Sequence, residues 1–413
     1  MLPRAWCIAS TVFALSACGR VLELRDDYYL AAGGYLSTAG STGGGLASAG
    51  DSSTAGGGTS GENGTGGAGG TGGALNIAGA AGETSLFTMP DGKLVFERYS
   101  RYEVGDSKMY VVTFPGGTIG PELSATYDIC SPFNGIFSPD GRYLVVGAVP
   151  ASVCPNGYLD RNELELYILD LENPTPQGKQ RVTDNNVPDE DPQYAPDGKS
   201  ILFKHGGYLA RWVVGSTPFI ETCADAGGSY CFKHSGGLFQ SKPVVDDTGY
   251  VCYESSLNQG DPNGDILCFD LAVGLAGKDI TLQDNVTRAV GHTNIYDSRP
   301  VIALPYLYYT RWRVPAAPHT NQIWRKQLKN LSKPEELAAF CVDEGVGYED
   351  VFSLGVGDLV VFSTNANAVG MGDLYIGDFK QKESMSLSDI APGVNSPLEE
   401  LGAAFWHAPA PLP

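Results

Sequence analysis

Short apolar runs separated by polar turns fill most of this chain, from about residue 85 onward. The tripeptide Pro-Asp-Gly marks three of the turns, at 90–92, 139–141 and 196–198, and Asp-Thr-Gly at 247–249 is a variant of it. Asp-Gly between apolar runs is typical of a tight hairpin turn, because glycine readily adopts positive φ. Runs rich in Val, Ile, Leu, Phe and Tyr follow each turn, so the pattern predicts a series of β-hairpins.

The hairpins belong to a longer repeat. A third apolar run recurs with a mean period of about 53 residues, at the equivalent positions Met109, Leu166, Leu209, Leu267, Ile323 and Leu374. Repeats of this length with several strands each are typical of β-propellers, whose four-stranded blades bury their apolar faces against one another. We therefore expect an all-β fold, a six-bladed β-propeller over residues 85–413, with seven blades as the alternative.

The end of the repeat predicts how the ring closes. Residues 403–409 resemble the first strand of a unit but lack the hairpin that normally follows it. We expect this segment to complete a blade that begins near residue 85. Helical periodicity is nearly absent, and one short helix is expected over Lys333–Phe340.

Two stretches resemble the repeat of TolB-type propellers, Phe137–Leu144 (FSPDGRYL) and Asp189–Phe203 (DEDPQYAPDGKSILF). The resemblance covers residues 85–409 and implies the propeller fold. TolB is a periplasmic protein that binds other envelope proteins through its propeller, so the resemblance also implies a binding role. It does not extend to the separate N-terminal α/β domain of TolB. We expect a non-catalytic scaffold that binds an envelope protein or a glycan.

Residues 1–17 have the pattern of a bacterial signal peptide. Arg4 precedes an apolar stretch that is too short to span a bilayer, and Leu15-Ser16-Ala17-Cys18 resembles a lipoprotein lipobox. Gly19 in place of Asp favours the outer membrane by the sorting rule of enteric bacteria. We expect export, a lipid on Cys18, and a domain in the periplasm or at the cell surface. An ordinary secretory signal is the alternative.

Residues 18–84 are predicted to be a disordered Gly/Ser/Thr/Ala-rich tether. The segment Ala31–Thr84 holds 20 of the 54 glycines of the chain. Such a segment cannot bury enough apolar surface to offset the entropy of ordering it. The tether would let the folded domain move near the membrane.

The charge of the chain falls mainly on the repeat region. Formal net charge is −20, and residues 85–413 carry 24 basic against 41 acidic residues. This balance argues against nucleic acid as a partner, because phosphate binding needs clustered Lys and Arg. It favours a basic or cationic partner.

Candidate binding residues lie where acidic segments enter first strands. First strands line the central channel of a propeller, so Asp191, Asp297 and Asp350 could ring its mouth and hold a cation or a basic group. The alternative is that these carboxylates cap turns or face solvent. Asp261, Asn263 and Asp265 alternate as calcium ligands do, but the bidentate Glu of such loops is missing, and we expect a turn there and no metal.

The sequence carries no catalytic signature. The globular part has no Gly-x-Ser-x-Gly elbow, the chain has no His-Glu-x-x-His, and its five histidines are scattered without ligand spacing. We expect neither an enzyme nor a cofactor. A propeller enzyme of the lyase, glycosidase or lactonase type, with its active site at the channel mouth, is the alternative.

An exported chain favours disulfides. Three pairings are expected, Cys223 with Cys231 across a short loop, Cys252 with Cys268 on successive strands, and Cys130 with Cys154 around a hairpin. Buried free thiols are the alternative. Cys341 is left without a partner.

Overall fold

The Pro-Asp-Gly turns at 139–141 and 196–198 join antiparallel hairpins in the computed structural model. The one at 90–92 does not, because the strand that begins at Gly92 pairs with the last strand of the repeat. At one turn Gly141 has a φ of 69°, and its N–H donates to the carbonyl of Ser138, 2.8 Å away. The structure describes residues 87–100, 105–154, 161–220, 231–232, 239–256, 264–271, 284–285, 295–313, 321–328, 330–341, 346–365 and 372–408. The signal peptide, Cys18 and the tether lie outside these residues.

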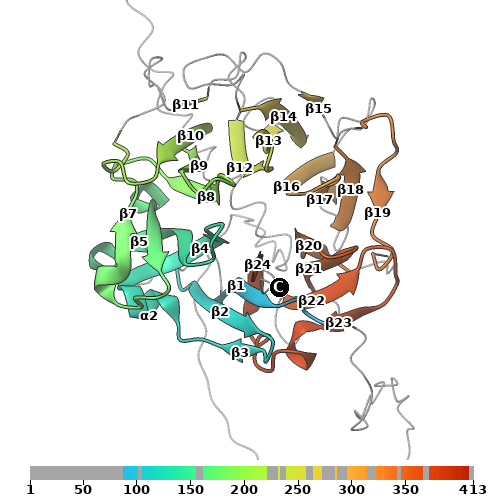
Figure 1. Cartoon of the computed structure of the whole chain (residues 1–413), viewed down its shortest axis with the longest axis horizontal. Helices are drawn as coiled ribbons and strands as arrows, with labels where there is room; N and C mark the ends of the chain where they lie inside the picture. The colour runs from blue at the N-terminus through green and yellow to red at the C-terminus, as the bar shows by residue number, and fades with distance from the viewer. Residues whose placement is uncertain are drawn as a thin grey trace, which may run out of the picture. The chain divides into compact units, whose positions relative to one another are not determined.

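Six inner strands lie toward the centre of the β-propeller (Figure 1). They are β4 (Ile129–Phe137), β8 (Asp189–Tyr194), β12 (Phe239–Val245), β16 (Ile295–Ala303), β20 (Tyr348–Ser353) and β24 (Glu399–His407). Each pairs with a second strand, in the same order β5 (Tyr143–Pro150), β9 (Ser200–His205), β13 (Tyr250–Ser256), β17 (Tyr306–Arg313), β21 (Leu359–Thr364) and β1 (Gly92–Tyr99).

Third and fourth strands complete the sheets. The third strands are β2 (Lys108–Phe114), β6 (Glu165–Asp170), β10 (Tyr208–Val213), β14 (Gly264–Asp270), β18 (Gln322–Gln327) and β22 (Asp373–Asp378). The outermost are β3 (Thr118–Ile119), β7 (Lys179–Arg181), β11 (Cys231–Phe232), β15 (Asp284–Asn285), β19 (Glu336–Leu337) and β23 (Ser384–Ser386). Four sheets have four strands, and β12 to β19 form one eight-stranded sheet in which β14 and β16 meet at a single parallel pair, Gly264 with Tyr296. The predicted all-β propeller is confirmed.

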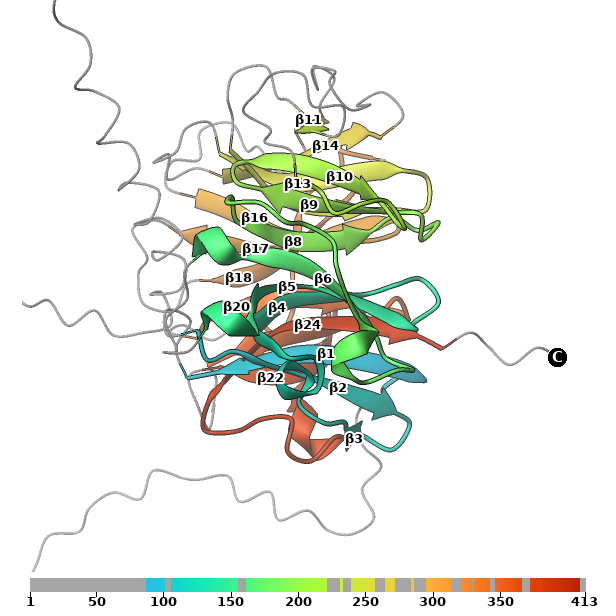
Figure 2. The same cartoon turned by 90° about the vertical axis from the view of Figure 1, so that its left-hand side faces the viewer.

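The last strand closes the ring. β24 runs antiparallel beside β1, from the pair Gly92 and His407 to the pair Tyr99 and Glu399 (Figure 2). β24 is thus the inner strand of the sheet whose other strands are β1, β2 and β3. The predicted closing segment is confirmed.

Apolar side chains fill the spaces between neighbouring sheets. Successive residues of a strand point to opposite faces. On β1, Leu94 and Phe96 therefore pack toward Val361 and Ile376 of the β20–β23 sheet, whereas Val95 joins the cluster of the β4–β7 sheet. Both faces of each sheet are buried in this way, which explains the continuous apolar runs in the sequence.

The prediction of a helix over Lys333–Phe340 is wrong. β19 forms there instead, and the Ala338 N–H donates to the carbonyl of Ile323 at 3.0 Å. Phe340 stacks on Phe362 with ring centroids 4.4 Å apart, so this segment packs as the outer edge of a sheet. The α-helix in the described part of the chain is α2 (Leu123–Tyr127), and no helix there is long and apolar enough to cross a membrane.

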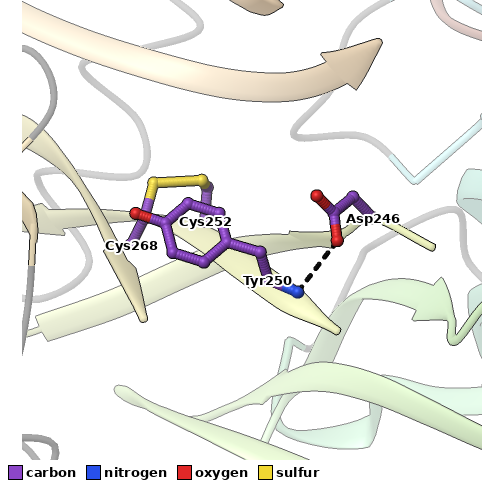
Figure 3. Close-up of a disulfide and its surroundings, with 4 residues drawn as sticks. All are labelled: Asp246, Tyr250, Cys252 and Cys268. Atoms are coloured by element: carbon purple, nitrogen blue, oxygen red, sulfur yellow. Dashed lines mark hydrogen bonds between the residues drawn. A yellow bond between two sulfur atoms is a disulfide. The ribbon is translucent and has the colours of Figure 1, made fainter. Parts of the chain in front are cut away.

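Cys252 and Cys268 are joined by a disulfide, as predicted (Figure 3). They lie directly opposite each other on β13 and β14. At the start of β13, an Asp246 carboxylate oxygen accepts a hydrogen bond of 2.9 Å from the Tyr250 N–H. Cys231 is also disulfide-bonded, but its predicted partner Cys223 lies outside the described residues.

The predicted disulfide between Cys130 and Cys154 is not formed. Both residues are free thiols, although their side chains are in hydrogen-bond contact. Burial and this contact raise the pKa of Cys130 to about 12. The spacing around the hairpin thus brings the two residues together but does not set the side-chain geometry that a disulfide requires. Cys341 is free and buried, as expected.

Candidate functional site

Every inner strand carries a β-bulge at the same position. Its register against the second strand shifts there, for example between Glu190 and Gln193 on β8 and between Ser241 and Val244 on β12. The first residue of each bulge is left-handed, with φ between 47° and 63°. We call these six residues the channel ring: Asn134, Asp191, Lys242, Arg299, Asp350 and Gly402.

Left-handed backbone is costly for most ring residues. It disfavours an L-residue by roughly 1–2 kcal/mol, although Asn and Asp tolerate it better than Lys or Arg. Proline follows the ring residue at Pro192, Pro243 and Pro300, where the bulge leaves room for a residue without an N–H. Strained backbone of this kind is found disproportionately at functional sites.

Carboxylates tie the ring residues of adjacent strands together. Asp191 accepts a hydrogen bond of 3.3 Å from the Lys242 N–H, and Asp350 accepts one of 3.2 Å from the Gly402 N–H. The Asn134 N–H donates to Glu97, which comes from β1. These contacts hold the left-handed residues in place, so the ring is a rigid feature of the fold.

Glu97 takes the place of the side chain that Gly402 lacks. A Cβ added at Gly402 would lie 2.4 Å from Glu97 Oε1. The Glu97 side chain is therefore set into the ring from the second strand, and the residue is only 4% exposed.

The channel ring forms one end of a central cavity of about 200 Å³. Residues that follow the ring along the inner strands line the remainder, and most of them are apolar. This apolar sleeve consists of Ile136, Pro192, Pro243, Val244, Pro300, Val301, Ile302, Val351, Phe352, Ala403 and Ala404. The cavity is thus charged at one end and apolar beyond it.

Both ring cations already have an anionic neighbour. Lys242 Nζ lies 3.4 Å from Glu254 Oε2, and Arg299 forms an ion pair with Asp350. Burial opposes ionisation of Glu254, but Lys242 and hydrogen bonds from Ser298 and Tyr296 outweigh it and lower its pKa.

The carboxyls of Glu97 and Asp191 behave in the opposite way. Burial raises the pKa of Glu97 to about 7, although the Asn134 N–H and the Arg299 charge partly offset the effect. Burial also raises the pKa of Asp191, and the charges of Lys242 and Lys204 offset it only in part. The structure therefore holds two acidic groups, one in the ring and one behind it, whose charge is poorly compensated.

The structure places two of the three predicted channel residues on the cavity wall, Asp191 and Asp350. Their role in binding stays a prediction. The prediction for the third residue, Asp297, is wrong. Asp297 lies two residues before the ring position and is only 2% exposed. Its carboxylate accepts hydrogen bonds of 2.7 and 2.9 Å from the Arg311 guanidinium. In the tentative calcium segment, Asp261 and Asn263 lie outside the described residues, and Asp265 lies on β14.

Sequence reasoning missed the other members of the site. Asn134, Lys242, Arg299 and Glu97 were not singled out. A positional signal does exist for the ring, because Asn134, Asp191 and Lys242 each precede the glycine of their hairpin turn by seven residues. No sequence signal marks Glu97, whose position depends on the missing side chain of Gly402.

The Glu97 carboxyl should make stability depend on pH. Its pKa is about 7 in the folded chain against 4.5 ordinarily, so the folded state alone keeps the proton between these values. Stability should therefore fall as pH rises from about 4.5 to about 7, with the full penalty above that range. Glu97→Gln should remove this contribution and gain stability relative to the wild type at pH 8 but not at pH 4. Urea unfolding at both pH values measures it.

The exposed Glu383 supplies the matched control, since Glu383→Gln should leave the pH dependence of stability unchanged. Glu400 also has a pKa raised by burial to about 7, so part of the slope should remain in Glu97→Gln. An equal difference between Glu97→Gln and the wild type at both pH values would contradict the raised pKa.

No family model matches the sequence, and no curated protein matches it. Solved structures do. TolB from Acinetobacter baumannii aligns with a TM-score of 0.51 at 14% identity, covering 77% of this chain and 67% of that one. The fold is a β-propeller similar to that of TolB. Hydrazine synthase from Kuenenia stuttgartiensis aligns with a TM-score of 0.54 at 12% identity, over 76% of this chain and 47% of that protein, about half its length. At these identities the likeness concerns the fold alone.

Proposed function

We propose that this chain is a cell-envelope lipoprotein whose β-propeller acts as a non-catalytic binding scaffold. Its partner is an envelope protein or a glycan that presents a basic group to the channel ring. The observation that carries the proposal is the ring itself, six left-handed positions around a cavity, four of which hold charged side chains. Rigid strands that position a few polar groups beside an apolar cavity are typical of binding sites.

The envelope location rests on the sequence. A lipid on Cys18 and a tether over residues 18–84 would keep the propeller close to a membrane, with the outer membrane favoured by Gly19.

The eight-stranded sheet corresponds to two blades, which gives six blades with one inner strand each. The similarity to a TolB propeller supports the propeller fold on which this role rests.

The acidic end of the channel is the proposed partner face. Two inner strands begin there with the half-buried acidic residues Glu349 and Glu399, whereas the hairpin turns lie at the opposite end. Asp189 and Glu190 also lie at this end, but they are buried against His205 and Lys204. A basic group on the partner would meet this end first, because opposite charges steer association.

Site-specific photo-crosslinking in the native envelope tests the scaffold. A photoreactive residue at Asn186 or at Leu398, both exposed and just ahead of inner strands, should capture the same partner. The control position is Val356, which is 47% exposed in the hairpin turn at the opposite end. Capture confined to Asn186 and Leu398 is the expected result. Equal capture from Val356, or none from any position, would contradict the proposal.

An enzyme is the second candidate, and Glu97 is the observation that favours it. A carboxyl with a pKa of about 7 beside a second carboxyl suits general acid–base catalysis, as in glycosidases. A screen of lyase, glycosidase and lactonase substrates distinguishes the two candidates. Turnover that disappears in Glu97→Gln would favour the enzyme.

A further inference from the structure

The cavity wall carries two acidic side chains, Asp191 and Asp350, and two basic ones, Lys242 and Arg299. Three more carboxyls, those of Glu97, Glu254 and Glu349, lie close to these cations, so acidic groups outnumber basic ones around the cavity. Lys242 and Arg299 face Glu254 and Asp350, respectively. Glu97, Asp191 and Glu349 form no ion pair in the described part of the chain. Their polar neighbours are uncharged donors: the Asn134 N–H, the Asn134 and Asn321 side-chain amides and the Lys242 N–H.

Glu97 is the clearest of these groups. It is 96% buried, and within the described residues its only hydrogen bond comes from the Asn134 N–H to Oε1. Its carboxyl lies beside Gly402, which lines the cavity. A buried carboxyl needs a compensating charge or a proton, and here the Arg299 charge compensates only part of the burial because Arg299 is itself paired with Asp350. The raised pKa values of Glu97, Asp191 and Glu349 agree with this geometry.

The arrangement of these groups does not suit a metal ion. In the part of the chain that the structure describes, no three Asp, Glu, His or Cys side chains converge closely enough to hold one. A metal needs several oxygen ligands within about 2.6 Å of one point. An ammonium group needs less, because its three N–H donors point to separate acceptors.

The rest of the cavity fits an apolar body attached to such a head. The apolar sleeve begins directly after the channel ring on each inner strand. The whole cavity has a volume of about 200 Å³, against about 30 Å³ for one water in the liquid, so it has room for about seven non-hydrogen atoms.

We propose that the central cavity binds an organic ammonium ion, with its head at the channel ring beside Asp191, close to the Glu97 carboxyl behind Gly402, and its alkyl body along the apolar sleeve. The inference rests on the proposed binding function and names the chemistry of the group that is bound. A free alkylamine and the lysine side chain of a partner share this chemistry. Either would replace the missing positive charge of the ring.

Calorimetric titration of the full chain with hexylammonium tests the inference. Hexylammonium should bind, whereas hexanol and hexanoate should not. Glu97→Gln and Asp191→Asn should each weaken binding by about tenfold or more, because each removes a charged acceptor. The exposed Glu383→Gln is the matched control and should bind as the wild type does. Thermal unfolding of each variant shows that it is folded.

Nα-acetyl-lysine amide tests whether the ammonium group comes from a partner lysine, and calcium tests whether the site prefers a metal ion. If Nα-acetyl-lysine amide binds at the same site, a partner lysine is the source; if only hexylammonium binds, a free amine is. Any of three results would overturn the inference. Hexanol could bind as strongly as hexylammonium, both Glu97→Gln and Asp191→Asn could leave the affinity unchanged, or equimolar calcium could displace the amine. Partner capture from Asn186 and Leu398 together with any of these results would leave the scaffold intact and remove only the ammonium site.

Discussion

A chain that ends at residue 398 should lose its cooperative thermal unfolding transition. The deletion removes β24, which pairs with β1 along its length and contributes buried Leu401 and Phe405. Burial of one such side chain contributes about 1.5–3 kcal/mol. The deletion also uncovers the apolar faces of two neighbouring sheets, because Phe405 and Ala404 belong to different core clusters. A folded domain is stable by only about 5–15 kcal/mol, so these losses together should unfold it.

Differential scanning calorimetry of the truncated chain measures this effect. A synthetic peptide of residues 396–408 is the control, because a strand supplied from outside should pair with β1 and restore the transition. A truncated chain with a near-wild-type unfolding midpoint would show that β24 does not close the ring.

Arg325→Met should destabilise the chain by about 1.5–3 kcal/mol, because it removes charge-assisted hydrogen bonds and the packing of the guanidinium on two aromatic rings. The Arg325 side chain is fully buried and its guanidinium lies 4.1 and 4.2 Å from the ring centroids of Tyr306 and Phe379. It pairs with Glu336 at 2.6 Å and also with Asp358. Methionine would fill part of the space but leave both carboxylates without this partner.

Lys380 offers a matched control, because it contacts the same Asp358 carboxylate at 2.9 Å but is 64% exposed. Exposed pairs contribute about 0–1 kcal/mol, so Lys380→Met should have little effect. Urea unfolding of both variants compares the two positions. Equal destabilisation by the two substitutions would contradict the assigned role of Arg325.

The β-hairpins and the closing of the ring by the last strand could be predicted, because both leave a local pattern in the sequence. The turn glycines require positive φ, and the apolar runs between them alternate with polar loops, so strands and their order follow from the residues. The disulfide between Cys252 and Cys268 follows in the same way, because the two residues flank one hairpin. Spacing around a hairpin gave the wrong answer for Cys130 and Cys154, since it does not set the distance and direction of the two side chains.

The channel ring could be predicted only in part. Acidic entries to first strands indicated Asp191 and Asp350, but the same composition also indicated Asp297, which pairs with Arg311 within its own sheet. Lys and Arg are rare in left-handed bulges, so their types did not suggest ring positions for Lys242 and Arg299. Glu97 comes from another strand, and only the assembled sheet brings it beside Gly402.

Proton release on ligand binding is the most direct test of a site built from uncompensated carboxyls. Hexylammonium binding can be measured by calorimetry at pH 7 in two buffers with different ionisation enthalpies. A cation beside Glu97 should lower its pKa from about 7, so the complex should release protons, and Glu97→Gln should release fewer. Binding without proton release in the wild type would contradict a cation site at Glu97.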